Sequence, residues 1–91
     1  MKINSLYPNP SNGTVQIDLS NFPGGFANIK VFNILGQEIY SQKIMKMSPG
    51  NHFINLNLEN LNGLNISSGM FFIRLESAQQ QIVKKCIILK N

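Results

Sequence analysis

The chain has 91 residues and a mass of 10.2 kDa, and its 8 Lys+Arg against 4 Asp+Glu give a formal charge of +4 and a pI near 9.5. A chain of this length forms one domain and buries about 60–65% of its unfolded surface. Such a core leaves little room for a deep, walled active-site cavity, so a self-contained enzyme is disfavoured. The densest apolar run, Ile82 to Leu89, is interrupted by Lys84 and Lys85. We therefore expect no direct membrane insertion.

Neither the N-terminus nor the cysteine content points to an export leader or to covalent cross-links. Met1 to Asn4 is followed by Ser, Tyr and Pro before any apolar stretch forms, so this segment does not resemble a signal peptide. The single cysteine, Cys86, cannot form an intramolecular disulfide. Its apolar neighbours predict a small buried hydrophobe.

Apolar and polar residues alternate along most of the chain, which is typical of strands with one buried face. In chain order, the expected strands cover about residues 14–19, 28–31, 37–44, 51–58, 70–77 and 81–89. Turns at Gly13, Gly24-Gly25, Gly36, Gly50 and Gly63 separate them. The pattern predicts an all-β protein, an antiparallel immunoglobulin-like β-sandwich of about seven short strands. We expect a crossover loop between Leu58 and Ser68.

Residues that could carry chemistry are few and scattered. The acids Asp18, Glu38, Glu59 and Glu76 lie in different segments, so the sequence places no carboxylate pair for acid–base work. One cysteine and one histidine, Cys86 and His52, cannot form a zinc site from soft ligands, and no glycine-rich phosphate loop is present. We therefore expect no catalytic residue, metal ion or cofactor, and His52 is interpreted as a structural strand histidine.

Half of the basic residues lie near the end of the chain: Arg74, Lys84, Lys85 and Lys90. A positive face of this kind could bind an acidic partner, an acidic glycolipid or nucleic acid. Lysines on an end strand can equally serve to prevent edge-to-edge aggregation. No aromatic residue is interleaved with the cluster, so we expect no nucleic-acid partner.

Three blocks of the chain carry a resemblance to a known family. The first is Leu6-Tyr7-Pro8-Asn9-Pro10, the second runs from Ile29 to Ile39 through Asn33-Ile34-Leu35-Gly36, and the third comprises Leu61, Ser68 to Leu75 and Lys84 to Lys90. Together they resemble the type A C-terminal sorting domain of the type IX secretion system over nearly the whole chain. The departures are Asn33 where aspartate is common, Phe71 where tyrosine is common, a longer stretch before Gly69 and an extra apolar residue before Lys90.

The resemblance implies that residues 1–91 are one sorting domain excised from a larger cargo protein, with a lead-in over residues 1–10 and a β-sandwich over residues 11–91. Such cargo crosses the periplasm and reaches the cell surface or the extracellular space. An outer-membrane shuttle protein recognises the domain, and a cysteine-protease sortase removes it and commonly joins the cargo to anionic lipopolysaccharide. The cut is expected in or before Met1 to Leu6.

We expect the recognised surface to combine the lead-in with the last hairpin. Pro8 and Pro10 should hold the lead-in extended, and Tyr7 should anchor it on the sandwich. Lysines would steer docking, and Gly69 would permit close approach. The candidate recognition residues are Tyr7, Pro8, Asn9, Pro10, Gly69, Phe71, Lys84, Lys85 and Lys90.

Two other functions share much of this pattern. An immunoglobulin-like adhesion or carbohydrate-binding module would show the same alternation but should expose an aromatic platform, for which Phe53 and Phe72 are the candidates. A purely structural cap for a neighbouring domain would be needed for the stability of that domain, whereas a sorting signal should be separable from it.

Overall fold

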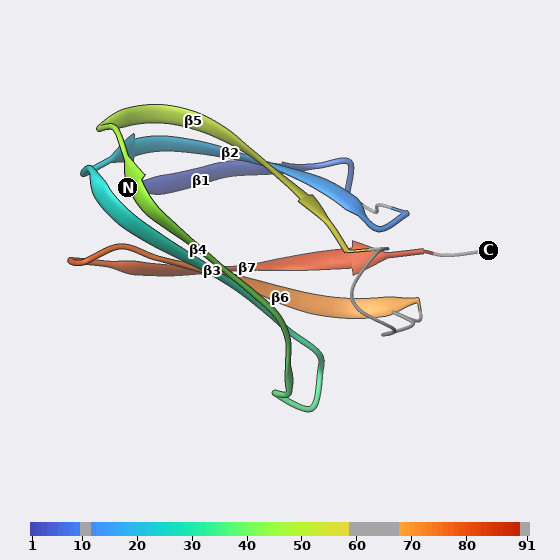
Figure 1. Cartoon of the computed structure of the whole chain (residues 1–91). Coiled ribbons are helices and arrows are strands. Elements are labelled where there is room, and N and C mark those ends of the chain that lie inside the picture. The colour runs from blue at the N-terminus through green and yellow to red at the C-terminus, as the bar shows by residue number, and fades with distance from the viewer. Residues whose placement is uncertain (10–11, 59–67, 90–91) are drawn as a thin grey trace.

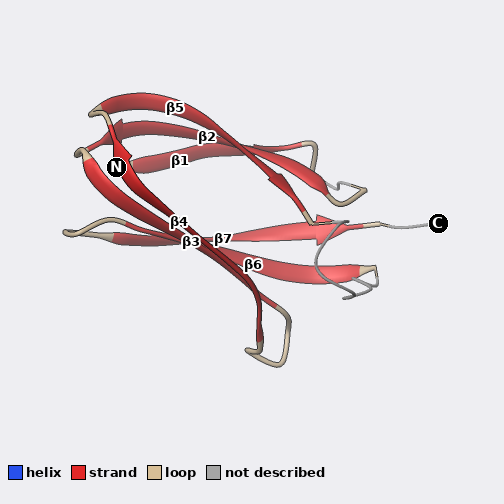
Figure 2. Cartoon of the chain, viewed as in Figure 1, coloured by secondary structure: helices blue, strands red, loops and turns tan. Residues whose placement is uncertain are grey.

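A computed structural model of the chain describes residues 1–9, 12–58 and 68–89, and within them it contains only strands and turns (Figure 2). Two antiparallel sheets face each other, one of three strands in the order β1-β2-β5 and one of four strands in the order β4-β3-β6-β7 (Figure 1). The predicted antiparallel sandwich is thus confirmed. The strands are β1 Lys2–Tyr7, β2 Thr14–Phe22, β3 Gly25–Phe32, β4 Glu38–Met47, β5 Gly50–Asn57, β6 Gly69–Glu76 and β7 Gln81–Ile88.

The core is a single apolar layer between the sheets. Strand pairing puts alternate residues of each strand on the inner face, so Ile17 lies opposite Ile54 in one sheet and Val31 opposite Ile73 in the other. Half of the buried hydrophobic residues are Ile or Val, whose β-branched side chains suit a pleated surface. The buried hydrophobic residues are Ile3, Val15, Ile17, Leu19, Phe22, Ala27, Ile29, Val31, Ile54, Leu56, Leu58, Phe71, Ile73, Leu75, Cys86 and Ile88. The expected burial of Cys86 is confirmed.

Two of the connections between the sheets are short corners that lie within the described residues, and they lie against each other. The β2–β3 corner contains Gly24 and the β4–β5 corner contains Pro49. Gly24 has a φ of +94°, and a Cβ at this position would come within 3.0 Å of the Pro49 ring. Only glycine meets both demands at low cost, because it tolerates positive φ and has no side chain.

The first segment of the chain differs from the prediction. Residues 1–10 were expected as a lead-in outside the sandwich, but Lys2–Tyr7 forms the edge strand β1 and pairs with β2. A register shift between Ile3 and Ser5 brings Ile3 opposite Leu19 and Leu6 opposite Ile17. The bulge hides the strand from a period-two analysis, because Ile3 and Leu6 are three residues apart and yet face the same core. The crossover loop expected between Leu58 and Ser68 lies largely outside the described residues.

Truncation of one core side chain should measure how much the domain depends on this layer. Ile73 is fully buried in β6. The substitution Ile73→Val should lower the free energy of unfolding by about 0.5–1.5 kcal/mol, and Ile73→Ala should lower it by about 2–5 kcal/mol. Urea unfolding followed by circular dichroism checks both values. Phe53→Ala is the control, since Phe53 is 68% exposed and its loss should cost less than about 1 kcal/mol. Equal costs for the two alanine variants would contradict the assignment of the core.

Candidate recognition surface at the β1–β7 edge

The polypeptide that follows β1 reaches the edge of the other sheet. The backbone N–H of Ile87 donates a hydrogen bond to Asn9 Oδ1 at 3.0 Å, across 78 positions of sequence. Because β7 is an edge strand paired only with β6, the N–H groups of alternate residues point away from its partner. Asn9 satisfies one of these groups. The structure therefore joins two of the predicted segments, the first sequence block and the last strand, into one surface, here called the β1–β7 edge (residues 7–9 and 84–89).

Tyr7 does not anchor this segment. Its side chain is 72% exposed, whereas Ile3 of the same strand is only 1% exposed. Ile3, the half-buried Leu6 and the Asn9 hydrogen bond hold the segment in place. Pro8 is also exposed and follows a cis peptide bond. Pro10 lies outside the described residues.

The two described lysines of β7 are exposed, but they belong to opposite faces of the sheet. Lys84 pairs with the fully buried Ile73, which places Lys84 at an inward position of the edge strand. Lys85 pairs with Phe72 and lies on the outer face. The basic groups therefore border both sides of the edge. Lys90 lies outside the described residues.

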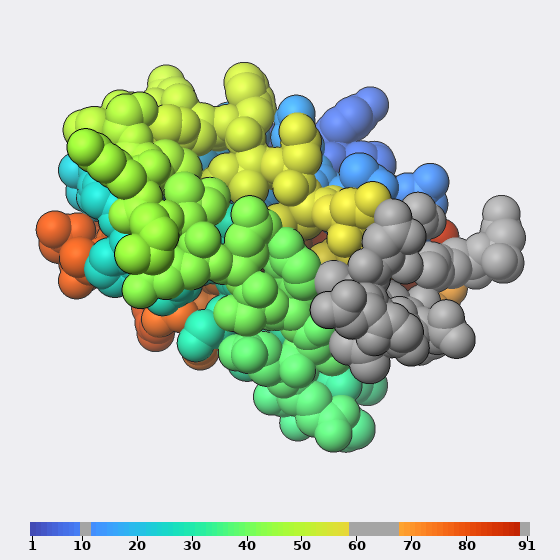
Figure 3. All heavy atoms as spheres, viewed as in Figure 1, coloured from blue at the N-terminus to red at the C-terminus, as the bar shows by residue number. Residues whose placement is uncertain are grey.

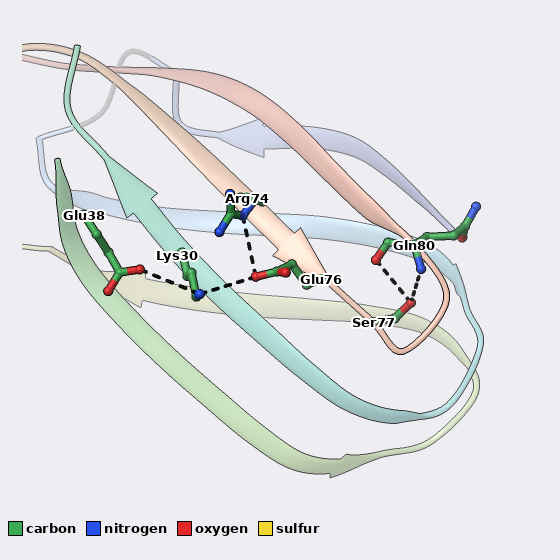
Figure 4. A network of polar contacts seen from close by, with 6 residues as sticks. All are labelled: Lys30, Glu38, Arg74, Glu76, Ser77 and Gln80. Atoms are coloured by element: carbon green, nitrogen blue, oxygen red, sulfur yellow. Dashed lines mark hydrogen bonds and ion pairs between the residues drawn. The ribbon is translucent and has the colours of Figure 1, made fainter. Parts of the chain in front are cut away.

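Arg74 does not extend this basic surface. Its Nε lies 3.5 Å from Glu76 Oε1, and its guanidinium is 4.8 Å from the centroid of the Phe32 ring. Lys30 Nζ bridges Glu76 and Glu38 at 3.7 and 3.8 Å. Figure 4 shows Glu38 of β4, Lys30 of β3 and Arg74 and Glu76 of β6 as one row across three neighbouring strands. Because carboxylates balance the charge of Arg74, the predicted basic cluster reduces to lysines.

Phe71 and Gly69 were expected to take part in recognition, and the structure places them as follows. Phe71 is only 6% exposed and lies in the core opposite Cys86, so it supports β7 from the inside. Gly69 pairs with Ile88 at the start of β6, and no register shift interrupts the pairing of β6 with β7. Its φ is +153°, and a Cβ there would meet no heavy atom within 4 Å. The described neighbours therefore leave space beside Gly69, and its backbone conformation is the constraint on residue type.

The described residues were searched for groups that could hold a metal ion. No group of three His, Cys, Asp or Glu side chains able to hold a metal ion is found among them. The His52 ring lies 2.7 Å from the Ser48 carbonyl oxygen through Nε2 and packs edge-on to Phe22, which agrees with its structural interpretation. Within residues 1–9, 12–58 and 68–89, no helix is long and apolar enough to span a bilayer.

The aromatic residues considered for a carbohydrate platform are far from forming one. Phe53 faces outward from β5 in one sheet, opposite Asp18, and Phe72 faces outward from β6 in the other sheet, opposite Phe32. The two rings therefore lie on the two opposite outer faces of the sandwich. A flat sugar-binding surface cannot use both.

Sequence reasoning overlooked two features of this end of the molecule. It did not predict the Asn9 contact, because a side-chain bond across 78 residues leaves no local signal. It also did not select Ile34 and Leu35, whose side chains are 69% and 78% exposed. Two adjacent aliphatic residues inside a turn break the polar composition expected of a turn, and that signal was available.

Loss of the Asn9 side chain should loosen the β1–β7 edge locally. Asn9→Ala removes the acceptor of the Ile87 N–H, which should cost about 0.5–1.5 kcal/mol of unfolding free energy and accelerate exchange of that amide. Hydrogen–deuterium exchange read by NMR measures this. Asn9→Asp keeps an oxygen acceptor and serves as the matched control. Unchanged exchange at Ile87 in Asn9→Ala would contradict the contact.

The inward position of Lys84 should protect the edge from self-association. Lys84→Ile would extend the inner-face apolar row of Ile82, Cys86 and Ile88 and would remove a charge from the edge strand β7, which favours edge pairing between copies. We expect concentration-dependent association beyond that of the wild type in size-exclusion chromatography with light scattering. Lys84→Arg keeps the charge and should behave as the wild type. Identical elution of Lys84→Ile and Lys84→Arg would contradict the prediction that Lys84 prevents self-association.

Comparison with known protein families identifies the family of this chain. The model of the secretion system C-terminal sorting domain family matches residues 5–89 of the 91-residue chain. A search of curated proteins gave no significant match. The matched region includes the first two sequence blocks, the third block up to Leu89 and both parts of the β1–β7 edge. The chain belongs to the family of secretion system C-terminal sorting domains, the tails that direct cargo of the type IX system toward the cell surface or the extracellular space.

Proposed function

We propose that the folded domain is read in the periplasm by an outer-membrane shuttle protein of the type IX system, which recognises the β1–β7 edge. Family membership supports the sorting role. The observation that carries the choice of surface is the hydrogen bond from Ile87 N–H to Asn9 Oδ1, because it holds the first sequence block against the last strand. A partner that docks on this edge therefore contacts both segments together.

Rigidity and charge both suit this surface to recognition. The lead-in is fixed by β1 pairing, by the buried Ile3 and by Asn9, so little ordering entropy opposes binding. Lys84 and Lys85 border the edge on its two faces and are exposed. Together with Lys90 they would steer an acidic partner toward the edge. The proposed shuttle surface is accordingly acidic.

We also propose that a sortase removes the domain by cutting N-terminal to Lys2. A protease needs its substrate extended and accessible, whereas residues from Lys2 onward are paired with β2 and Ile3 is buried. Cleavage within β1 would require that strand to leave the sheet. The cut was expected in or before Met1 to Leu6. The part of this region that is paired with β2 is therefore a poor protease substrate, and the polypeptide before it is a better substrate.

Removal of lysine charges tests the proposed surface in an export assay. A fluorescent protein with a periplasmic signal is fused to residues 1–91 and a few upstream residues, in a host with a working type IX system. We expect Lys84→Ala/Lys85→Ala/Lys90→Ala to lower the rate of appearance at the cell surface or in the medium about tenfold, because steering is lost. The control Lys2→Ala/Lys43→Ala/Lys46→Ala removes the same charge from other strands and should export normally.

The substitutions are preferable to deletion of the last strand. Removal of residues 84–91 would take Cys86 and Ile88 out of the core, so loss of export could reflect unfolding. Circular dichroism of both triple variants checks that they fold. Efficient export of the Lys84/Lys85/Lys90 variant would contradict the proposal that the β1–β7 edge is recognised. Periplasmic retention of the folded wild-type fusion would contradict the proposed sorting function.

A further inference from the structure

The turn between β3 and β4, residues 33–37, is locked by its first residue. Asn33 Oδ1 accepts hydrogen bonds from the backbone N–H groups of Leu35 at 2.9 Å and Gln37 at 3.0 Å, and Asn33 Nδ2 donates to Gln37 Oε1 at 2.8 Å. The backbone adds Asn33 N–H to Gln37 O and Gly36 N–H to Asn33 O, both at 3.0 Å. Gly36 supplies the positive φ, +82°, that closes the turn.

This rigid turn presents two aliphatic side chains to solvent. Ile34 is 69% exposed and Leu35 is 78% exposed, and Leu35 is the more exposed of the two. The β3–β4 hairpin extends away from the other strands in Figure 1, and its turn stands out at the lower margin of the space-filling view in Figure 3. The backbone conformation that exposes these side chains is therefore fixed before any partner arrives.

Local folding gives no reason for this choice of residues. The turn is closed by Asn33, Gly36 and Gln37, and none of its bonds uses the side chains of Ile34 or Leu35. Polar residues at these two positions would keep every bond and avoid exposing apolar surface to water. Adjacent exposed aliphatics on a preorganised tip are typical of a binding element.

The chemistry of the tip favours a protein pocket over a membrane. Residues 33–37 contain no charged and no aromatic side chain, whereas interfacial membrane anchors combine apolar residues with Trp, Tyr, Lys or Arg. The nearest charged residue along β4, Glu38, is paired with Lys30 at 3.8 Å. The turn at residues 33–37 is therefore neutral, and its two exposed side chains are apolar. A complementary partner surface would be an uncharged pocket that accommodates two branched side chains.

We propose that the 33–37 turn is a second recognition element, which inserts Ile34 and Leu35 into an apolar, uncharged pocket of the protein that reads this domain during export. The inference rests on the proposed sorting function but not on the β1–β7 edge. Asn33 is a positioning residue, since it holds the backbone and does not itself enter the pocket.

The test uses the same fluorescent fusion. Ile34→Ser/Leu35→Ser should lower the export rate at least about tenfold, because both apolar contacts are lost, while the urea midpoint stays unchanged because the side chains are exposed. The matched control is Met45→Ser/Phe53→Ser, which alters two residues that are 73% and 68% exposed on other parts of the sheets. It should export as the wild type does.

Variants of Asn33 separate positioning from packing. Asn33→Asp keeps the oxygen that accepts from Leu35 and Gln37 and should retain export, whereas Asn33→Ala should lose most of it. Wild-type rates in both Ile34→Ser/Leu35→Ser and Asn33→Ala would overturn the inference and leave the sorting function standing. Retention of the wild-type fusion in the periplasm would overturn both.

Vesicle binding decides between a pocket and a membrane. The purified wild-type domain should not co-sediment with vesicles of phosphatidylethanolamine and phosphatidylglycerol. Co-sedimentation that disappears in Ile34→Ser/Leu35→Ser would identify a lipid surface as the ligand of the turn and would overturn the proposed pocket.

Discussion

Every surface feature of this domain depends on the single apolar layer between its two sheets. The layer is filled from both sides by alternate residues of each strand, such as Ile17 and Leu56 in one sheet and Ile29 and Ile73 in the other. With one cysteine in the chain, no intramolecular disulfide supplements it. Burial of apolar surface must therefore offset the conformational entropy of a small chain almost unaided. The rigid edge and the rigid turn persist only because this layer holds the strands behind them.

Much of the fold could be predicted because its dominant signal is local. Alternation along Thr14–Phe22 and Gly69–Glu76 reports which face is buried, and a strand with one buried face has few alternatives. β1 was missed because its bulge shifts Ile3 and Leu6 out of the two-residue period. Tyr7 was misjudged for a related reason, since the residue type predicts an anchor while the strand register turns it to solvent.

The candidate site was less predictable, because its organisation is not local. The resemblance in sequence selected Asn9 and the last strand separately, but only the structure shows the bond that joins them. Parity alone would have separated Lys84 from Lys85, and pairing with Ile73 and Phe72 confirms that they face opposite sides. Phe71 belongs to the core, so its part in any recognition is to support the strand that the partner would contact.

The direction of β1 has a consequence for the polypeptide that precedes it. The N-terminus lies at one end of the sandwich, and the chain crosses the full length of the sheet before it reaches Tyr7 and Asn9 near the far end of β7 (Figure 1). In a protein that carries this domain as a tail, the preceding polypeptide leaves from the end opposite to that contact. The bulk of such a passenger is thereby kept clear of the residues around Asn9. A single tail of this geometry can serve passengers of very different size and shape without any change in its own structure.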